Sequence, residues 1–225
     1  MTKLLLYITF FFSCFLEAKA QKMKSFEVSF LSFWKDKPLQ LDEQYFLGND
    51  TCVLSEIKFY ISNIQLSDGE NVVFSEKNSF HLINHEQPTT EKVSLQIPEN
   101  LHFTTVKYNF GIDSLTQVDG VKGGDLDPTN GMYWTWQSGY IHFKLEGKSQ
   151  RCKGKNKEFQ FHLGGFIAPF NTNQIIKQPI DNDFSTTIIF DAAAFLSTIN
   201  LAETHHIMSP SKKAADLATK VFQSR

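Results

Sequence analysis

Short segments in which apolar and polar residues alternate constrain the fold of this chain more than any other feature. The pattern occurs at residues 26–30, 106–112, 141–145, 159–163 and 184–190. A period of two residues is typical of β-strands with one buried face. Residues 57–66 are apolar on both faces, so they predict a central strand. Turn signals such as Asp68-Gly69 and Lys153-Gly154 separate these runs, which favours several short strands.

Two helices are expected in addition to the strands. Asp191 can cap a short helix at residues 192–196. Ser209-Pro210 is a typical helix start, and apolar residues follow it at helical spacing: Ala214, Leu217, Ala218 and Val221. We therefore expect a mainly β domain, an antiparallel β-sandwich or barrel-like fold with a short helix and a C-terminal helix.

The N-terminus has the organisation of a secretory signal peptide. Lys3 precedes a nearly uninterrupted apolar run at residues 4–16, and Ala18-Lys19-Ala20 offers a cleavage site after Ala20. The run is too short for a membrane span, which needs about 20 apolar residues. Lipid attachment at Cys14 is the less favoured alternative, because Phe-Phe-Ser fits a lipobox poorly. We expect residues 1–20 to be a signal peptide and residues 21–225 a single domain, exported to the periplasm or the cell surface.

Cysteine usage and charge narrow the possibilities for the exported part. Removal of Cys14 with the signal leaves Cys52 and Cys152, and an even count in an exported protein predicts one disulfide; two unrelated thiols are the alternative. The formal net charge is −2, which gives no electrostatic footprint for nucleic acid. The basic run at residues 148–157 is interpreted as a solvated hairpin tip.

Residues 131–143 are unusually aromatic. If they formed one strand, Trp134, Trp136, Tyr140 and His142 would share a face opposite Ile141 and Phe143, unless a bulge at Ser138-Gly139 broke the parity. One interpretation is a half-buried strand whose tryptophans cover the core. The other is a platform in which Trp134, Trp136 and Tyr140 stack on a non-metal ligand such as a sugar.

Histidines supply the other candidate ligands. His162 lies on the polar face of its predicted strand, ahead of Gly164-Gly165. His205-His206-Ile207-Met208 places two imidazoles and a thioether together, and these are ligands that copper favours. Adjacent residues of a strand point to opposite faces, so we expect at most one of the two histidines to bind.

Calcium and enzymatic chemistry have weaker support. Asp119, Asp125 and Asp127 carry carboxylates that Ca²⁺ favours, but their spacing does not fit an EF-hand, and aspartate favours turns for its own reasons. The sequence contains no nucleophile elbow, zinc-protease motif, P-loop or dinucleotide fingerprint. A binding protein is therefore favoured over an enzyme.

Five ordered motifs resemble the MbnP-like family of exported copper-binding proteins. They are residues 58–64 (KFYISNI), 110–114 (FGIDS), 126–147 (with GMYWTWQSGY), 161–165 (FHLGG) and 206–210 (HIMSP). The resemblance implies a β-rich protein that binds copper. It implies metal candidates at His162, His206, Trp134, Trp136 and His142.

In some members of this family a tryptophan is oxidised to kynurenine by a partner di-haem oxidase, and it joins histidines at the copper. The resemblance thus implies copper, such an oxidase and an outer-membrane transporter as partners. This chain departs from those members, because no histidine lies within a few residues of Trp134 or Trp136; His142 is the nearest. The departure argues against the modification here. The expected function is copper acquisition, storage or handling outside the cytoplasm.

Overall fold

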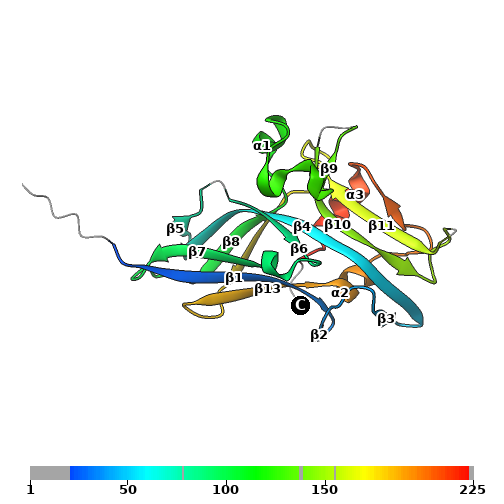
Figure 1. Cartoon of the computed structure of the whole chain (residues 1–225), viewed down its shortest axis with the longest axis horizontal. Coiled ribbons are helices and arrows are strands. Elements are labelled where there is room, and N and C mark those ends of the chain that lie inside the picture. Colours follow the sequence, from blue (N-terminus) through cyan, green and yellow to red (C-terminus); the bar gives the residue numbers. More distant parts are fainter. Residues whose placement is uncertain (1–20, 78, 137–138, 155, 223–225) are drawn as a thin grey trace, which may run out of the picture.

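The expected mainly β architecture is confirmed by a computed structural model that describes residues 21–77, 79–136, 139–154 and 156–222. Two sheets face each other, as Figure 1 shows. The predicted signal peptide, residues 1–20, lies outside the described residues. Within the described part of the chain, no helix is long and apolar enough to cross a membrane.

The smaller sheet is built around β1 (Met23–Trp34), which contains the first alternating segment. β13 (Ser185–Asp191) pairs with it in parallel, so the expected antiparallel sandwich includes parallel pairing. β7 (Lys92–Pro98) and β2 (Lys37–Pro38) pair with β1 antiparallel.

The larger sheet has the strand order β12-β8-β4-β10-β11-β14, with β3, β5 and β6 on β4 and β9 on β10. Its pairs are antiparallel except for β11 with β14, which are parallel. The central-strand prediction for residues 57–66 is confirmed, because this segment lies in β4. The strands are β3 (Gln44–Leu47), β4 (Asp50–Asp68), β5 (Asn71–Ser75), β6 (Phe80–Asn84), β8 (Thr105–Phe110), β9 (Tyr133–Trp134), β10 (Gly139–Ser149), β11 (Glu158–Gly164), β12 (Gln174–Pro179) and β14 (His206–Ile207).

The main core lies between the sheets and is rich in phenylalanine. The apolar residues of the alternating segments point into it, among them Phe26, Phe30, Phe110, Phe143 and Phe161. Their rings meet mostly edge to face, for example Phe143 and Phe190 with centroids 5.3 Å apart, a geometry that aromatic pairs favour. The alternation of the sequence therefore decides which face of each strand is buried.

Both predicted helices exist and close this core. Asp191 caps α2 (Ala192–Ser197) by accepting from the backbone N–H groups of Ala193 and Ala194 at 3.0 and 3.2 Å. The predicted start of the C-terminal helix at Ser209-Pro210 is wrong. The cap of α3 (Lys212–Ala218) is Ser211, whose hydroxyl accepts from the N–H of Ala214, so the helix begins later. Its predicted apolar face is buried as expected, at Ala214, Leu217, Ala218 and Val221.

The long loop at residues 113–130 contains structure that the sequence pattern did not predict. Asp113 caps the short helix α1 (Ser114–Val118), and two 3-10 turns follow, η2 (Gly124–Leu126) and η3 (Pro128–Asn130); another, η1 (Pro88–Glu91), precedes β7. Together with β9, the loop covers a second apolar cluster: Tyr60, Leu82, Ile112, Leu126, Met132, Trp134, Tyr140 and Ile141. Part of the outer face of the larger sheet is therefore buried.

The aromatic segment at residues 131–143 is a hairpin, so the arrangement expected for a single strand is wrong. β9 turns back onto β10, with Trp134 opposite Gly139. The bulge falls near His142, because Ile141 pairs with Gly164 while Phe143 pairs with Leu163. Ile141 consequently joins the second cluster, whereas Phe143 lies in the main core.

Candidate metal-binding face

Strand register brings two of the predicted histidines onto one face of the larger sheet. Phe161 and Leu163 of β11 point into the main core, so Gln160 and His162 point to the opposite, outer face. β14 pairs with β11 in parallel, with Gln160 opposite His206. His162 and His206 are therefore diagonal neighbours on this face. Ordinary strand spacing puts their Cα atoms about 8 Å from each other.

Met208 follows on the same side. The next register position after Ile207 would be level with His162. Further along, Pro210 lies beside Gly165, since a Cβ on Gly165 would come within 3.1 Å of the proline. Met208 lies one residue beyond β14, and extended backbone continued from His206 would direct its thioether toward the outer face. The face therefore carries two imidazoles, and a thioether follows two residues after His206; together these are soft ligands.

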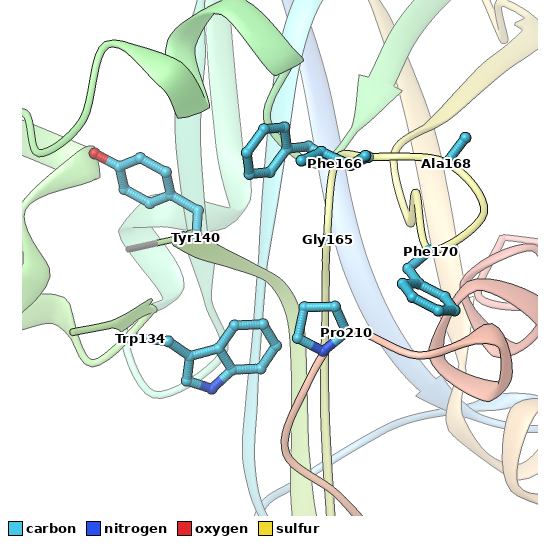
Figure 2. A pocket seen from close by; sticks show the side chains of 9 residues that line it. Trp134, Tyr140, Gly165, Phe166, Ala168, Phe170 and Pro210 are labelled. Atoms are coloured by element: carbon cyan, nitrogen blue, oxygen red, sulfur yellow. The ribbon is translucent and has the colours of Figure 1, made fainter. Parts of the chain in front are cut away.

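Trp134 covers the neighbouring end of β11. Its ring packs so closely on Gly164 that a Cβ there would lie 2.7 Å from Cζ3. The side chain is 6% exposed, and its Nε1 has no hydrogen-bond partner among the described residues. An unpaired indole N–H is an uncompensated donor. In Figure 2 this nitrogen points away from the neighbouring Tyr140 and Phe166.

A cavity of about 260 Å³ lies beside Trp134. Figure 2 shows its apolar walls, formed by Trp134, Tyr140, Phe166, Phe170 and Pro210. The Tyr140 hydroxyl is used internally, since it donates to the Leu126 carbonyl at 3.2 Å. Trp136 is 66% exposed and its ring centroid lies 6.0 Å from that of Trp134. Because Trp134 and Tyr140 are buried, the three rings do not form the open platform of the alternative hypothesis.

His162 is buried and oriented by a carboxylate. Its Nε2 lies 2.6 Å from Oε1 of Glu146, and its Nδ1 makes no hydrogen bond among the described residues. Burial lowers the pKa of His162, and the bond to Glu146 only partly opposes this. The ring is thus neutral near pH 7. Histidines that bind metals commonly donate their second ring N–H to a carboxylate, which leaves the other nitrogen free to ligate.

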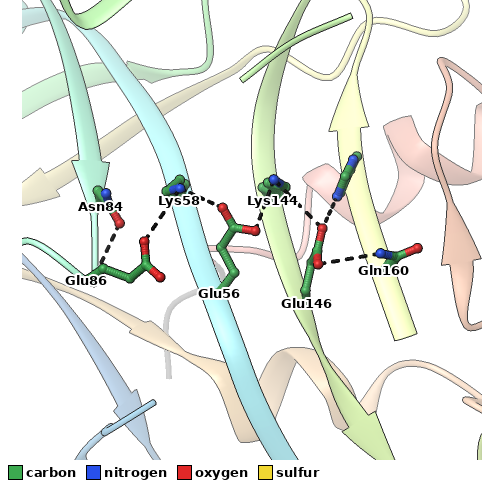
Figure 3. Close-up of polar contacts among 8 residues, drawn as sticks. Glu56, Lys58, Asn84, Glu86, Lys144, Glu146 and Gln160 are labelled. Atoms are coloured by element: carbon green, nitrogen blue, oxygen red, sulfur yellow. Dashed lines mark hydrogen bonds and ion pairs between the residues drawn. The ribbon is translucent and has the colours of Figure 1, made fainter. Parts of the chain in front are cut away.

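Glu146 belongs to a row of alternating charges across the outer face, drawn in Figure 3. Lys144 lies 3.8 Å from Glu146 and 3.0 Å from Glu56, and Lys58 lies 2.6 Å from Glu56. Burial opposes the charge of Glu56, but the two ammonium groups outweigh it and lower its pKa. The row fixes Glu146 laterally and therefore fixes the imidazole of His162.

His142 is separated from this face by the bulge and is fully buried. Gln117 accepts from the N–H of Tyr140 at 2.9 Å, so its amide donates to Nε2 of His142 at 2.6 Å. Nδ1 then donates to the hydroxyl of Thr172 at 2.9 Å. Burial lowers the pKa of His142 to about 3. Both ring nitrogens are occupied, so in this conformation His142 has none available for a metal.

His206 is exposed and borders a cavity of about 340 Å³ with Glu158, Gln160 and His205. Nδ1 of His205 is buried and has no hydrogen-bond partner in the described part of the chain. His206 is the one of the pair that lies level with Gln160, whereas His205 precedes β14 and borders the same cavity. That at most one of the two imidazoles binds stays a prediction.

The aspartates of the loop at residues 113–130 serve local structure. Asp119 pairs with Lys122 at 3.2 Å, Asp125 accepts from the N–H of Leu82 at 2.9 Å, and Asp127 caps η3. Within residues 21–222, masked positions aside, no group of three or more His, Cys, Asp or Glu side chains is arranged to hold a metal. The ligands that remain for a metal on the outer face are His162 and His206, with Met208 as a candidate third ligand.

Cys52 and Cys152 are buried free thiols in this structure. They lie near each other, because Cys52 pairs with Ser149 and the N–H of Cys152 donates to the Ser149 carbonyl at 3.1 Å. The disulfide expected from the cysteine count is not formed here and stays a prediction.

Glu146 and its row of charges were missed in the sequence. The signal was present, because Lys144 and Glu146 occupy the polar positions of an alternating segment, as His162 does in the next one. Which polar residues meet depends on register: Lys144 pairs with His162, and Glu146 with Gln160.

Comparison with known proteins supports the resemblance seen in the sequence. Among solved structures, "MbnP from Methylosinus trichosporium" is similar, with a TM-score of 0.59 and 13% identity over 79% of this chain and 78% of that chain. At that identity the similarity shows the fold. Comparison with curated protein sequences gives no match. Residues 23–209 match the family described as MbnP, and the chain therefore belongs to the MbnP family.

Proposed function

We propose that this chain is an exported binding protein that holds copper on the face carrying His162 and His206. The register of β11 and β14 is the observation that carries the proposal, because it brings both histidines to one side of the sheet. Met208 follows two residues after His206. Family membership points in the same direction, toward a methanobactin-associated role. The task would be acquisition, storage or handling of copper in the periplasm or at the cell surface.

The state of His162 also supports this function. Its ring is neutral near pH 7, Glu146 orients it through Nε2, and Nδ1 remains free to ligate. Trp134 lies beside it on Gly164. Two imidazoles and a thioether suit the soft Cu(I) ion better than hard cations such as Ca²⁺.

Titration of residues 21–225 with Cu(I) in the presence of a competing chelator tests the proposal. We expect one copper per chain, and we expect His162→Ala and His206→Ala each to weaken binding strongly. His102→Ala is the matched control, since His102 is exposed. The proposal is wrong if the wild-type protein does not bind stoichiometrically, or if both variants bind as the control does.

Export is tested separately. Intact mass of the protein isolated from its native host should correspond to a chain beginning at Gln21. The same spectrum reports oxidation of Trp134 or Trp136, and metal analysis of the same sample reports the bound ion. A chain that retains residues 1–20 would contradict the export proposal without affecting copper binding.

The cavity beside Trp134 favours a second candidate function, the binding of a small apolar ligand. Its walls carry four aromatic or proline rings besides Trp134, and a volume of about 260 Å³ approaches that of small-molecule sites. Fluorescence titration with small aromatic compounds tests it. Trp136→Phe removes the exposed indole, so any remaining response can be assigned to the more buried tryptophans.

A further inference from the structure

The end of the larger sheet opposite β9 holds a buried cluster of two thiols, a hydroxyl and a carboxylate. Cys52 of β4 pairs with Ser149 of β10. The chain then turns, and the N–H of Cys152 donates to the Ser149 carbonyl at 3.1 Å. Both cysteines are 0% exposed. The turn thus places Cys152 against Cys52, although 100 positions separate them in the sequence.

Asp50 supplies the carboxylate of this cluster and is 4% exposed. Its Oδ2 accepts from the Ser149 hydroxyl at 2.5 Å and faces Sγ of Cys52 at 3.9 Å. Its Oδ1 is buried without a hydrogen-bond partner in the described residues. A buried oxygen with no donor is costly, and here it belongs to the carboxylate that faces the Cys52 thiol.

The two thiols differ in access. Cys52 lies in a strand paired on both sides, with Tyr45 of β3 and Ser149 of β10. Cys152 lies in the turn after β10, between the exposed residues Arg151 and Lys153. Turns open locally more readily than central strands. Opening of this turn would expose Cys152 and leave Cys52 covered.

The charges around the two thiols also favour reaction at Cys152 before Cys52. Burial raises the pKa of Cys52 to about 12, and the neighbouring Asp50 adds to the effect. Burial also raises the pKa of Cys152, but Lys157 opposes this. The turn is basic, and Lys148, Arg151, Lys153 and Lys157 would attract an anionic reagent.

We propose that Cys52 and Cys152 form an oxidisable dithiol, in which Cys152 reacts first with an anionic external disulfide and Cys52 closes the bond with Asp50 as its proton acceptor. In the first step the Cys152 thiolate attacks the external disulfide, forms a mixed disulfide and releases one external thiolate, which takes up the proton that Cys152 lost. The external disulfide is the oxidant.

In the second step the Cys52 proton passes to Asp50, and the Cys52 sulfur attacks Sγ of Cys152. The second external thiolate leaves and receives the proton from Asp50. One external disulfide is reduced to two thiols, and one Cys52–Cys152 bond forms. Neither cysteine belongs to the proposed copper face, although the turn that carries Cys152 borders, at Gly154, the cavity beside His206. The reaction itself needs no copper.

Reaction of the reduced mature protein with glutathione disulfide, followed by intact mass, tests the order. Wild type should form the internal disulfide without accumulating an adduct. Cys52→Ser should accumulate a glutathione adduct at Cys152, and Cys152→Ser should stay unmodified while folded. Modification of Cys52 in folded Cys152→Ser at the wild-type rate would overturn the proposal.

Asp50→Asn tests the proton acceptor while keeping both thiols. We expect closure to slow by about tenfold or more at pH 7, so that the mixed disulfide becomes detectable, and we expect the slowing to diminish as pH rises. Asp183→Asn is the control, because Asp183 is exposed. Closure of Asp50→Asn at the rate of the control at every pH would exclude this role for Asp50.

Discussion

Nε2 of His162 and Oε1 of Glu146 lie 2.6 Å apart on neighbouring strands of the outer face. The contact is diagonal, because Lys144 is the register partner of His162. Lys144 also contacts Glu56, so the carboxylate of Glu146 is fixed from one side and orients the imidazole on the other. The histidine is thus held in one orientation before any ligand arrives.

Glu146→Gln should weaken copper binding while leaving the fold intact. The amide keeps the size of the side chain but removes the charge that orients the ring, and loss of such a partner commonly costs about 10–100-fold in metal affinity. Chelator competition measures the effect. Glu70→Gln is the control, since the Glu70 side chain is 97% exposed. Equal affinity in the two variants would show that Glu146 does not support the metal.

Gly164→Ala should destabilise the protein and disturb Trp134. A Cβ at this position would lie 2.7 Å from Trp134 Cζ3 and 2.7 Å from the Tyr140 carbonyl oxygen. The carbonyl is backbone and cannot rotate away, so we expect a cost of about 1–3 kcal/mol in the free energy of unfolding. Urea denaturation followed by tryptophan fluorescence measures it.

Gly123→Ala is the matched control for this substitution. A Cβ on Gly123 meets no atom within 4 Å, so we expect a change within about 0.5 kcal/mol. A Gly164→Ala protein as stable as this control would show that the indole can move off the sheet at little cost.

Much of the fold could be predicted because alternation alone decides which strand face is buried. Residues 26–30 and 159–163 illustrate this, since their apolar positions all lie in the main core. Parallel pairing of β1 with β13 could not be predicted, because alternation carries no information about the direction of the partner. The helix α1 was missed because its apolar residues Leu115 and Val118 are exposed, and no buried face produces a helical pattern.

The candidate site was predictable only in part, for a similar reason. The outward direction of His162 follows from the alternation of its strand, but the direction of the His142 side chain does not. A Cβ on Gly111 would lie 2.6 Å from Nδ1 of His142, so the imidazole occupies space that only the glycine just after β8 leaves open. That contact accompanies the bulge in β10 and separates His142 from His162. Long-range packing of this kind leaves no trace in local sequence.

His85 should make stability depend on pH through Glu91. Nδ1 of His85 lies 2.5 Å from the Glu91 carboxylate, and this bond raises the pKa of His85. A raised pKa means that the folded state holds its proton more tightly than the unfolded chain. The stability that this bond adds is complete at pH values below the pKa of histidine in the unfolded chain, about 6.5. It is lost as the pH rises through the pKa of His85 in the folded protein.

Glu91→Gln should therefore cost more stability at low pH than at high pH. Urea denaturation at pH 5.5 and pH 9 measures the difference from wild type, which we expect to reach about 1.5–3 kcal/mol at the lower pH. Glu99→Gln, at an exposed position, is the control. If Glu91→Gln lost the same free energy of unfolding at both pH values, the bond of Glu91 to the charged imidazole would be no stronger than its bond to the neutral imidazole.

His142 should give the opposite pH dependence. Its folded pKa is lowered to about 3 because the ring is fully buried, so between about pH 3 and pH 6.5 the unfolded chain binds a proton that the folded state does not. Stability contributed by the neutral ring is present above the unfolded pKa and falls as pH decreases, by up to about 1.4 kcal/mol per pH unit. His142→Gln lacks the titrating group, so its loss of stability from pH 6.5 to pH 4 should be smaller than that of wild type, even if it is less stable overall.

The copper affinity of His142→Gln at pH 7 should match wild type, because both nitrogens of His142 are engaged by Gln117 and Thr172. A variant with the wild-type pH slope would show that His142 becomes protonated without unfolding, and one that loses copper would place His142 at the metal.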